Sequence, residues 1–321
     1  MKILIVGAGV IGTTYAWQLA QAGYDITLLV RKGKASQLAE EGIHIHCTDE
    51  RSKKPQQVDT LYRPRVVDDV YSGDRYEMMI VCVKANQLDG VLPLLEEKAG
   101  RADILFFLNN WLGDQKIKAR LKPSQYLFGF SKLVSGWRTA SAIECMISSA
   151  PGMSTMIGEP GGQLSPRVTD ISAIFAQARL KPEISRDILG WLAAHYVEYV
   201  GGVGGMLKAG SVQNFASNSA LVREAILATR EGLDVCRARG IDVGKSAPSN
   251  LKMYSLPLFI IVPLGKLQYG MKNIQQFFEE SIAHNLDELT IQYYDVLNEG
   301  KRLGVRMPHL ESFEPYYARY R

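Results

Sequence analysis

The segment Lys2–Gly12, with the sequence KILIVGAGVIG, decides the fold of this chain. Its apolar first part, KILIVG, is typical of a parallel strand that is buried on both faces. Gly7, Gly9 and Gly12 then form a GxGxxG pattern, and Thr13–Ala22 follows with a helical pattern. The segment therefore predicts a strand, a glycine turn and a helix at the start of an α/β domain.

Further buried strands are predicted along the first half of the chain. They are Asp25–Val30 (DITLLV), Glu77–Val83 (EMMIVCV), Asp103–Leu108 (DILFFL) and Tyr126–Phe130. Strands that alternate with helical segments imply right-handed crossovers and a parallel sheet. The predicted fold class is α/β, with an N-terminal Rossmann doubly wound parallel sheet followed by an all-helical C-terminal domain.

The pattern changes farther along the chain. Ala142–Ser148 and Ser154–Gly158, parted by a Pro-Gly pair, predict a hairpin. From Val168 onward the sequence predicts helices. The predicted helices include Ser185–Val200, Ser211–Arg239, Leu251–Gln268 and Asn273–Leu303. We therefore expect a first domain over residues 1–182 and a helical second domain over residues 183–321.

Composition excludes several classes of protein. The 321 residues are 46% hydrophobic and 22% charged, which excludes disordered, collagen-like and coiled-coil chains. The net charge is +4 and the 37 basic residues are scattered, so no nucleic-acid partner is expected. The longest apolar stretch, Leu256–Leu264, falls short of the ~20 residues of a membrane span. The 4 cysteines lack metal-type spacing, which favours a cytoplasmic location and no metal site.

The glycine turn is typical of dinucleotide-binding proteins. Gly7 allows a tight turn, Gly9 lets a pyrophosphate approach the backbone, and Gly12 lets the helix pack against the strand. Free N–H groups near Val10 and Ile11 favour an anion. The predicted cofactor-binding residues of the turn are Gly7, Ala8, Gly9, Val10, Ile11 and Gly12. A structural turn that binds nothing is the alternative.

The end of the second strand predicts which dinucleotide binds. NAD sites usually place an acidic residue there for the ribose 2′-hydroxyl, whereas this chain continues with Arg31, Lys32, Gly33 and Lys34. Arg31 can pair with a 2′-phosphate, so NADP(H) is the predicted cofactor. A solvated basic turn is the alternative.

Three further segments resemble the ketopantoate reductase (2-dehydropantoate 2-reductase) family. Val83–Gln87 (VKANQ) is similar to the family's VKA-x-Q segment, and Phe107–Gly113 (FLNNWLG) is similar to its strand that ends in Q/H-N-G-x-G. Asp287–Leu289, with Gly304 and Pro308 downstream, resembles the final helix that carries a functional glutamate.

The resemblance implies roles for residues outside the glycine turn. Lys84 and Asn110 would lie beside the nicotinamide, and Ser135 falls near a family position that touches the nicotinamide half of the cofactor. Glu288 would hold the substrate hydroxyl or the cofactor ribose. The alternatives are a surface lysine at position 84, a turn residue at position 110 and a solvated carboxylate at position 288.

The family's catalytic lysine has no direct counterpart. The matching context, Asp187–His195, places His195 at the lysine position, and Tyr199 stands where the family has an asparagine. Hydride delivery to a carbonyl builds negative charge on oxygen, which a protonated histidine can neutralise. Lys208 is the alternative proton donor, and a buried histidine without a catalytic role is the other alternative for His195. The predicted catalytic residues are His195, Lys208 and Glu288.

The resemblance implies NADPH-dependent reduction of a 2-keto acid to a 2-hydroxy acid. Reduction of 2-dehydropantoate to pantoate, in pantothenate biosynthesis, is the named candidate, and the substrate would bind between the two domains. An opine- or hydroxyacid-type dehydrogenase and a non-catalytic NADP(H)-sensing protein are the alternatives. The predicted partner is a small keto acid, and a homodimer is left open. His44 and His46 lack a third metal ligand, and His284 is a second-rank candidate four residues before Glu288.

Overall fold

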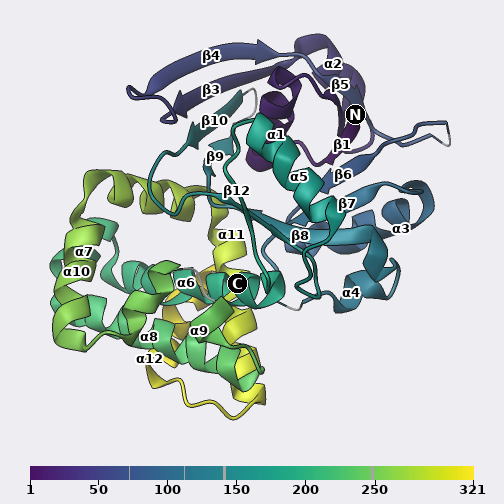
Figure 1. Cartoon of the computed structure of the whole chain (residues 1–321). Coiled ribbons are helices and arrows are strands. Elements are labelled where there is room, and N and C mark those ends of the chain that lie inside the picture. The colour runs from purple at the N-terminus through teal and green to yellow at the C-terminus, as the bar shows by residue number, and fades with distance from the viewer. Residues whose placement is uncertain (72, 112, 140–141, 247–248) are drawn as a thin grey trace. The chain divides into compact units, whose positions relative to one another are not determined.

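The computed structural model describes residues 1–71, 73–111, 113–139, 142–246 and 249–321 (Figure 1). Leu112, which belongs to the predicted FLNNWLG motif, lies outside the described residues. The chain divides into two compact units, Met1–Leu189 and Gly190–Arg321. The division falls seven residues beyond the boundary expected from the sequence (189 against 182).

An 8-stranded sheet organises the first unit, in the order β12-β11-β8-β7-β6-β1-β2-β5 (Figure 1). Its strands are β1 (Lys2–Val6), β2 (Asp25–Leu29), β5 (Arg65–Val67), β6 (Met78–Val81), β7 (Asp103–Phe107), β8 (Tyr126–Ser131), β11 (Thr155–Gly158) and β12 (Pro182–Ile184). The strands from β5 to β8 pair in parallel, which confirms the predicted parallel sheet. Strands β11 and β12 extend the sheet beyond β8. Strand β11 runs antiparallel to β8, and β12 pairs in parallel with β11.

A 4-stranded sheet of order β4-β3-β10-β9 was not expected from the sequence. Its strands are β3 (Ile43–Asp49), β4 (Gln56–Tyr62), β9 (Val134–Arg138) and β10 (Ala142–Ile147). The predicted hairpin is therefore wrong, because β10 pairs with β3 and β9 while β11 joins the larger sheet. Alternate residues of β10, Ile143, Cys145 and Ile147, are buried in the main core, so long-range burial outweighs the local turn.

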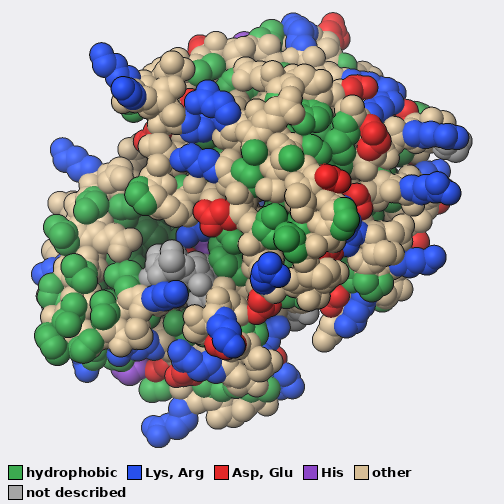
Figure 2. Space-filling model, viewed as in Figure 1, with side chains coloured by type: hydrophobic (Ala, Val, Ile, Leu, Met, Phe, Trp, Pro, Cys, Tyr) green, Lys and Arg blue, Asp and Glu red, His purple; other side chains and the backbone are tan. Residues whose placement is uncertain are grey.

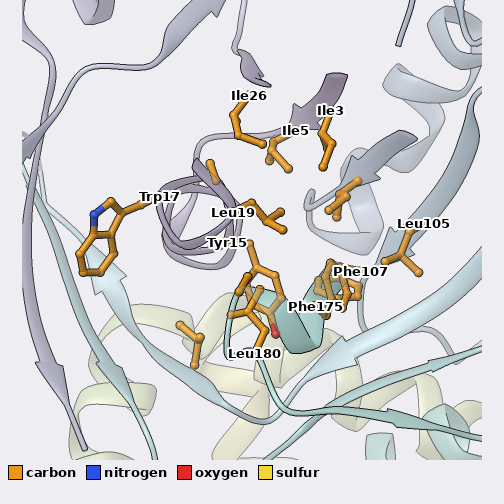
Figure 3. Packing of buried hydrophobic residues seen from close by; sticks show 14 of the residues in the cluster. Ile3, Ile5, Tyr15, Trp17, Leu19, Ile26, Leu105, Phe107, Phe175 and Leu180 are labelled. Carbon is orange, nitrogen blue, oxygen red and sulfur yellow. The ribbon is translucent and has the colours of Figure 1, made fainter. Parts of the chain in front are cut away.

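Helices pack against these sheets. They are α1 (Val10–Gln21), α2 (Ala35–Glu41), α3 (Leu88–Lys98), α4 (Gln115–Lys118) and α5 (Pro166–Gln177), with short 3₁₀ turns η1 (Ala85–Gln87) and η2 (Pro123–Gln125). Tyr15 of α1 packs edge-on against Phe107 and Phe175, at centroid distances of 5.1 and 5.7 Å (Figure 3). The Tyr15 hydroxyl lies 2.5 Å from Thr155 Oγ1, which itself donates to Leu180 O. This buried core fixes the position of α1 and of the glycine turn before it.

Every described element of the second unit is helical, as predicted. The chain enters it through α6 (Ile188–Ala209), followed by α7 (Val212–Ser217), α8 (Ser219–Ala238), α9 (Val243–Ser246), η3 (Ser249–Ser255), α10 (Leu258–Gly270), α11 (Lys272–Arg302), α12 (Pro308–Glu311), α13 (Glu314–Tyr317) and η4 (Ala318–Tyr320). The predicted helix over 211–239 is divided because Asn218 caps α8, where its side chain accepts from the N–H groups of Ala220 and Leu221. Pro257 likewise starts α10 inside the predicted helix over 251–268.

Helix α10 contains most of the longest apolar stretch of the sequence. Ile261 and Gly265 are buried against the unit, whereas Phe259 and Leu267 are exposed. Figure 2 shows the hydrophobic side chains that gather over α7 and α10. Within the described ranges, no helix has both the length and the apolarity required to cross a membrane.

Candidate functional site

Four neighbouring strands end together at one edge of the large sheet. The register aligns Leu29 of β2, Val6 of β1, Val81 of β6 and Phe106 of β7 in one row. The chain that follows each strand therefore emerges at the same edge, which is where open α/β sheets bind ligands. The segments concerned are the glycine turn after β1, the Arg31 turn after β2, and the segments that carry Lys84 and Asn110.

The glycines of the first turn have different structural roles. Gly7 has φ +103°, and a Cβ there would lie 2.7 Å from the carbonyl oxygen of Cys82. A Cβ at Gly12 would overlap the carbonyl oxygen of Gly7, so α1 lies too close to the glycine turn for any side chain. Gly9 differs, because nothing lies within 4 Å of a Cβ built on it. Its backbone therefore faces open space that a ligand can enter.

The start of α1 presents N–H groups to that space. Gly9 is the N-cap, no side chain caps the helix, and the first turn holds no acidic residue. The Gly9 carbonyl oxygen accepts from the Thr13 N–H at 2.9 Å, which leaves the N–H groups of Val10 and Ile11 at the end of the helix. Exposed backbone N–H groups at the positive end of a helix dipole favour the binding of a phosphate. The turn therefore fits the diphosphate of a dinucleotide.

Arg31 is exposed in the turn between β2 and α2. Sequence reasoning found no carboxylate near it, but the structure brings Asp68 to this turn, where Asp68 Oδ2 accepts from the Gly33 N–H at 2.8 Å. Asp68 follows β5, and β5 pairs in parallel with β2. Gly33 and Asp68 are 35 residues apart in sequence, so no local pattern could have paired them.

Lys84 and Asn110 lie after β6 and β7. The half-buried Lys84 precedes the 3₁₀ turn η1, where its N–H donates to Gln87 Oε1 at 3.2 Å. Asn110 is buried, and its amide donates to the Gly113 carbonyl oxygen at 2.7 Å, which holds the turn after β7. Ser135 lies on β9, in the smaller sheet, where it pairs with Met146. The large sheet thus brings together the predicted residues at positions 84 and 110, while Ser135 belongs to the other sheet.

His195 is buried on α6 in an aromatic environment. Its ring stacks on Trp191 at a centroid distance of 5.1 Å and packs edge-on against Tyr199 at 5.6 Å. His195 Nδ1 lies 2.9 Å from Glu198 Oε2, so an ionised Glu198 accepts a hydrogen bond from Nδ1–H. This contact fixes the ring and directs Nε2 away from the carboxylate. Sequence reasoning missed Glu198, although a glutamate three residues after a histidine on a helix was a usable signal.

Glu288 lies on α11 close to the helix that carries His195. Burial raises the pKa of Tyr196, which follows His195, and the charges of Asp295 and Glu288 raise it further. Tyr196 donates to Asp295 Oδ2 at 2.7 Å. The structure therefore brings carboxylates of α11 towards α6 within this unit.

Lys208 is engaged in an ion pair at the other end of α6. Its ammonium lies 2.6 and 2.9 Å from the two carboxylate oxygens of Glu224. Ser312 also donates to Glu224, at 2.7 Å. Burial acts to raise the pKa of Glu224, but these hydrogen bonds outweigh it and hold the pKa below its usual range.

His284 and His46 lie against other carboxylates. Asn285 leaves the helical conformation inside α11, so the helical spacing assumed between His284 and Glu288 is interrupted. His284 Nε2 lies 3.3 Å from Glu280 Oε2, one turn earlier. His46 of β3 lies 3.6 Å from Asp59. In the part of the chain that the structure describes, no three His, Cys, Asp or Glu residues are placed to hold a metal ion.

Comparisons with known proteins bear on the class of this fold. Residues 3–146 match the family model described as ketopantoate reductase PanE/ApbA. This match confirms, for the N-terminal part of the chain, the resemblance predicted from its motifs.

More distant similarities extend over the rest of the chain. The uncharacterized oxidoreductase YkpB of Bacillus subtilis is 24% identical over 189 residues, which are 59% of this chain and 58% of that protein. The chain thus matches less than two thirds of the length of that relative. The crystal structure of 2-dehydropantoate 2-reductase from Methylococcus capsulatus has a TM-score of 0.70 at 21% identity, covering 100% of this chain and 96% of that one. D-mandelate dehydrogenase, solved with NADH and anilino(oxo)acetate, has a TM-score of 0.71 at 15% identity, covering 99% and 97%. These structures share the fold.

Proposed function

We propose that this chain is an NADPH-dependent reductase that converts a 2-keto acid to a 2-hydroxy acid, with 2-dehydropantoate as the first candidate substrate. The observation that carries the proposal is the sheet edge at which the open glycine turn, Arg31, Lys84 and Asn110 follow adjacent parallel strands. The match of residues 3–146 to the ketopantoate reductase family supports it.

The residues of this edge would hold the cofactor. The N–H groups of Val10 and Ile11 would bind the diphosphate, with Gly9 leaving room for it. Arg31 would pair with the 2′-phosphate, which only NADPH carries. A bound reduced nicotinamide supplies the hydride. Lys84 and Asn110 would orient the nicotinamide half.

His195 would supply the proton to the carbonyl oxygen. Negative charge grows on that oxygen as hydride arrives, so a hydrogen-bond donor beside it lowers the barrier. With Nδ1 held by Glu198, the proton would leave from Nε2, and the Glu198 carboxylate would balance the imidazolium charge. We propose His195 rather than Lys208 for this step, because Lys208 is paired with Glu224 through both carboxylate oxygens. Glu288 would accept a hydrogen bond from the substrate hydroxyl.

A second candidate is a hydroxyacid dehydrogenase for a keto acid with a bulky apolar side chain. The observation that favours it is the aromatic cluster around His195. Trp191 stacks on the histidine, and Tyr199 continues to Phe277 and Phe278 at centroid distances of 6.5 and 6.0 Å. The D-mandelate dehydrogenase structure shares the fold, and an aromatic substrate would suit such surroundings.

A substrate panel tests both candidates. The purified chain is mixed with NADPH or NADH and with 2-dehydropantoate, phenylglyoxylate, 2-ketoisovalerate or pyruvate, and loss of the reduced cofactor's absorbance is followed. We expect turnover with NADPH and one of the first two acids, and a loss of at least ~100-fold in turnover for His195→Gln. His309→Gln is the matched control, because His309 Nδ1 also lies against a glutamate, 2.6 Å from Glu231. NADPH binding without turnover on any keto acid would instead indicate a non-catalytic sensor.

A further inference from the structure

An arginine from the smaller sheet reaches the glycine turn. Arg138 is the last residue of β9, and its Nη1 donates a hydrogen bond to the carbonyl oxygen of Ala8. Ala8 lies between Gly7, whose φ is positive, and Gly9, whose backbone faces open space. The guanidinium is therefore fixed at the turn to which the diphosphate is assigned, 130 residues away in sequence.

The charge of Arg138 is not balanced locally. Arg51 lies 2.7 Å from the Asp49 carboxylate and Arg167 lies 2.5 Å from that of Glu159, whereas no described carboxylate is within ion-pair distance of Arg138. Arg138 is exposed at the end of β9, although partial desolvation lowers the pKa of its guanidinium. A guanidinium beside the positive end of α1, with no acidic residue in the first helical turn, gains stability when an anion binds.

We propose that Arg138 is a further cofactor-binding residue, which pairs with the diphosphate of the dinucleotide while its Nη1 holds Ala8. This inference rests on the proposed function. The N–H groups that do not contact Ala8 form a planar fork that matches two phosphate oxygens. Arg138 would recognise the part shared by NADPH and NADH, whereas Arg31 would recognise the 2′-phosphate that only NADPH carries.

Calorimetric titration of the full chain tests this assignment without relying on turnover. The probes are NADPH, NADH and adenosine 2′-monophosphate, which keeps the group assigned to Arg31 and lacks the diphosphate. For Arg138→Met we expect NADPH and NADH to bind ~10–100-fold more weakly by the same factor, with binding of adenosine 2′-monophosphate unchanged. Arg31→Ala should give the opposite pattern, weakening NADPH and adenosine 2′-monophosphate and sparing NADH.

Matched variants separate a ligand contact from a purely structural role. Arg63 is also exposed, and its Nη1 also donates to a backbone carbonyl, that of Glu40, so Arg63→Met should bind all three probes like the wild type. Arg138→Lys keeps the charge and a donor, so it should recover part of the affinity for both dinucleotides. Raising the salt concentration should weaken dinucleotide binding less in Arg138→Met than in the wild type, because one charge pair is gone.

The outcomes separate this inference from the proposed function. Wild-type affinity for both dinucleotides in Arg138→Met would overturn the inference and leave the proposed function intact. Equal weakening of all three probes, or a lowered melting temperature, would assign Arg138 a structural role and also overturn it. Failure of the wild-type chain to bind either dinucleotide would overturn both.

Discussion

Lys208 and Glu224 form an ion pair that joins α6 to α8, with the ammonium 2.6 and 2.9 Å from the two carboxylate oxygens. Ser312 donates to the same carboxylate, and the Lys208 ammonium lies 5.7 Å from the centre of the Phe313 ring. The pair thus links two long helices to the C-terminal segment. This arrangement favours a structural role for Lys208.

The first prediction concerns the acid stability of this pair. The pKa of Glu224 is lowered in the folded chain, so the stability that the pair contributes is present above the unfolded pKa of about 4.3 and is lost as pH falls through the folded pKa. Lys208→Met should therefore unfold at lower urea concentrations than the wild type near neutral pH, and the difference should shrink in acid. Urea titrations across this pH range measure it.

A surface pair provides the control for that prediction. Lys301 lies 3.5 Å from Glu314, with both side chains substantially exposed, so Lys301→Met should change stability by less than about 1 kcal/mol at any pH. A stability difference for Lys208→Met that does not vary with pH would show that lost packing, and not the ion pair, is responsible.

The second prediction contrasts two glycines of the same turn. A Cβ at Gly12 would overlap the Gly7 carbonyl oxygen, so Gly12→Ala must displace α1 and should lower the melting temperature. A Cβ at Gly9 meets no atom within 4 Å, so Gly9→Ala should fold normally. Its extra methyl group would occupy the space assigned to the diphosphate, so its NADPH affinity should fall about 10-fold or more. Thermal melting and calorimetry distinguish the two, and a Gly9→Ala chain with normal affinity would contradict the assignment.

The third prediction concerns the choice between NADPH and NADH. Arg31→Ala should raise the Michaelis constant for NADPH about 10-fold or more and leave that for NADH nearly unchanged, because a charge-assisted hydrogen bond contributes about 1.5–3 kcal/mol. Asp68→Asn is the companion variant, since an asparagine oxygen can still accept from the Gly33 N–H. If Asp68 instead binds a ribose hydroxyl, this variant would weaken NADH binding, and the assignment of the cofactor to NADPH would be wrong.

The sequence was sufficient for the parts of the fold that local patterns define. Strands buried on both faces appear as continuous apolar runs, so β1, β2, β6 and β7 were located to within one or two residues. The smaller sheet was missed because its key pairing joins β3 to β10, about 100 residues apart, and no local signal records such a contact.

The same distinction applies to the candidate site. The glycine turn and Arg31 were predicted because their spacing along the chain carries the chemistry. Asp68 was not, because it reaches its position through the pairing of β5 with the distant strand β2. Arg138 was not, because its contact with Ala8 joins residues that are 130 positions apart in sequence. Glu198 belongs to a third case, since its spacing from His195 was visible but its contact depends on side-chain conformation.

The last prediction tests a buried ion pair outside the candidate site. Glu159 follows β11 with a fully buried carboxylate, 2.5 Å from the Arg167 guanidinium of α5, and Arg167 also donates to the Tyr126 carbonyl oxygen at 3.0 Å. Arg167→Met leaves the Glu159 charge without its cation in the core, so the free energy of unfolding should fall by about 3–5 kcal/mol. Lys116→Met, which breaks an exposed pair with Asp89, should cost less than about 1 kcal/mol. Denaturant unfolding measures both. Neither Arg167 nor Glu159 is assigned to the cofactor, so the folded fraction of the Arg167→Met protein should bind NADPH with wild-type affinity. Weaker binding would show that this end of the sheet affects the cofactor site.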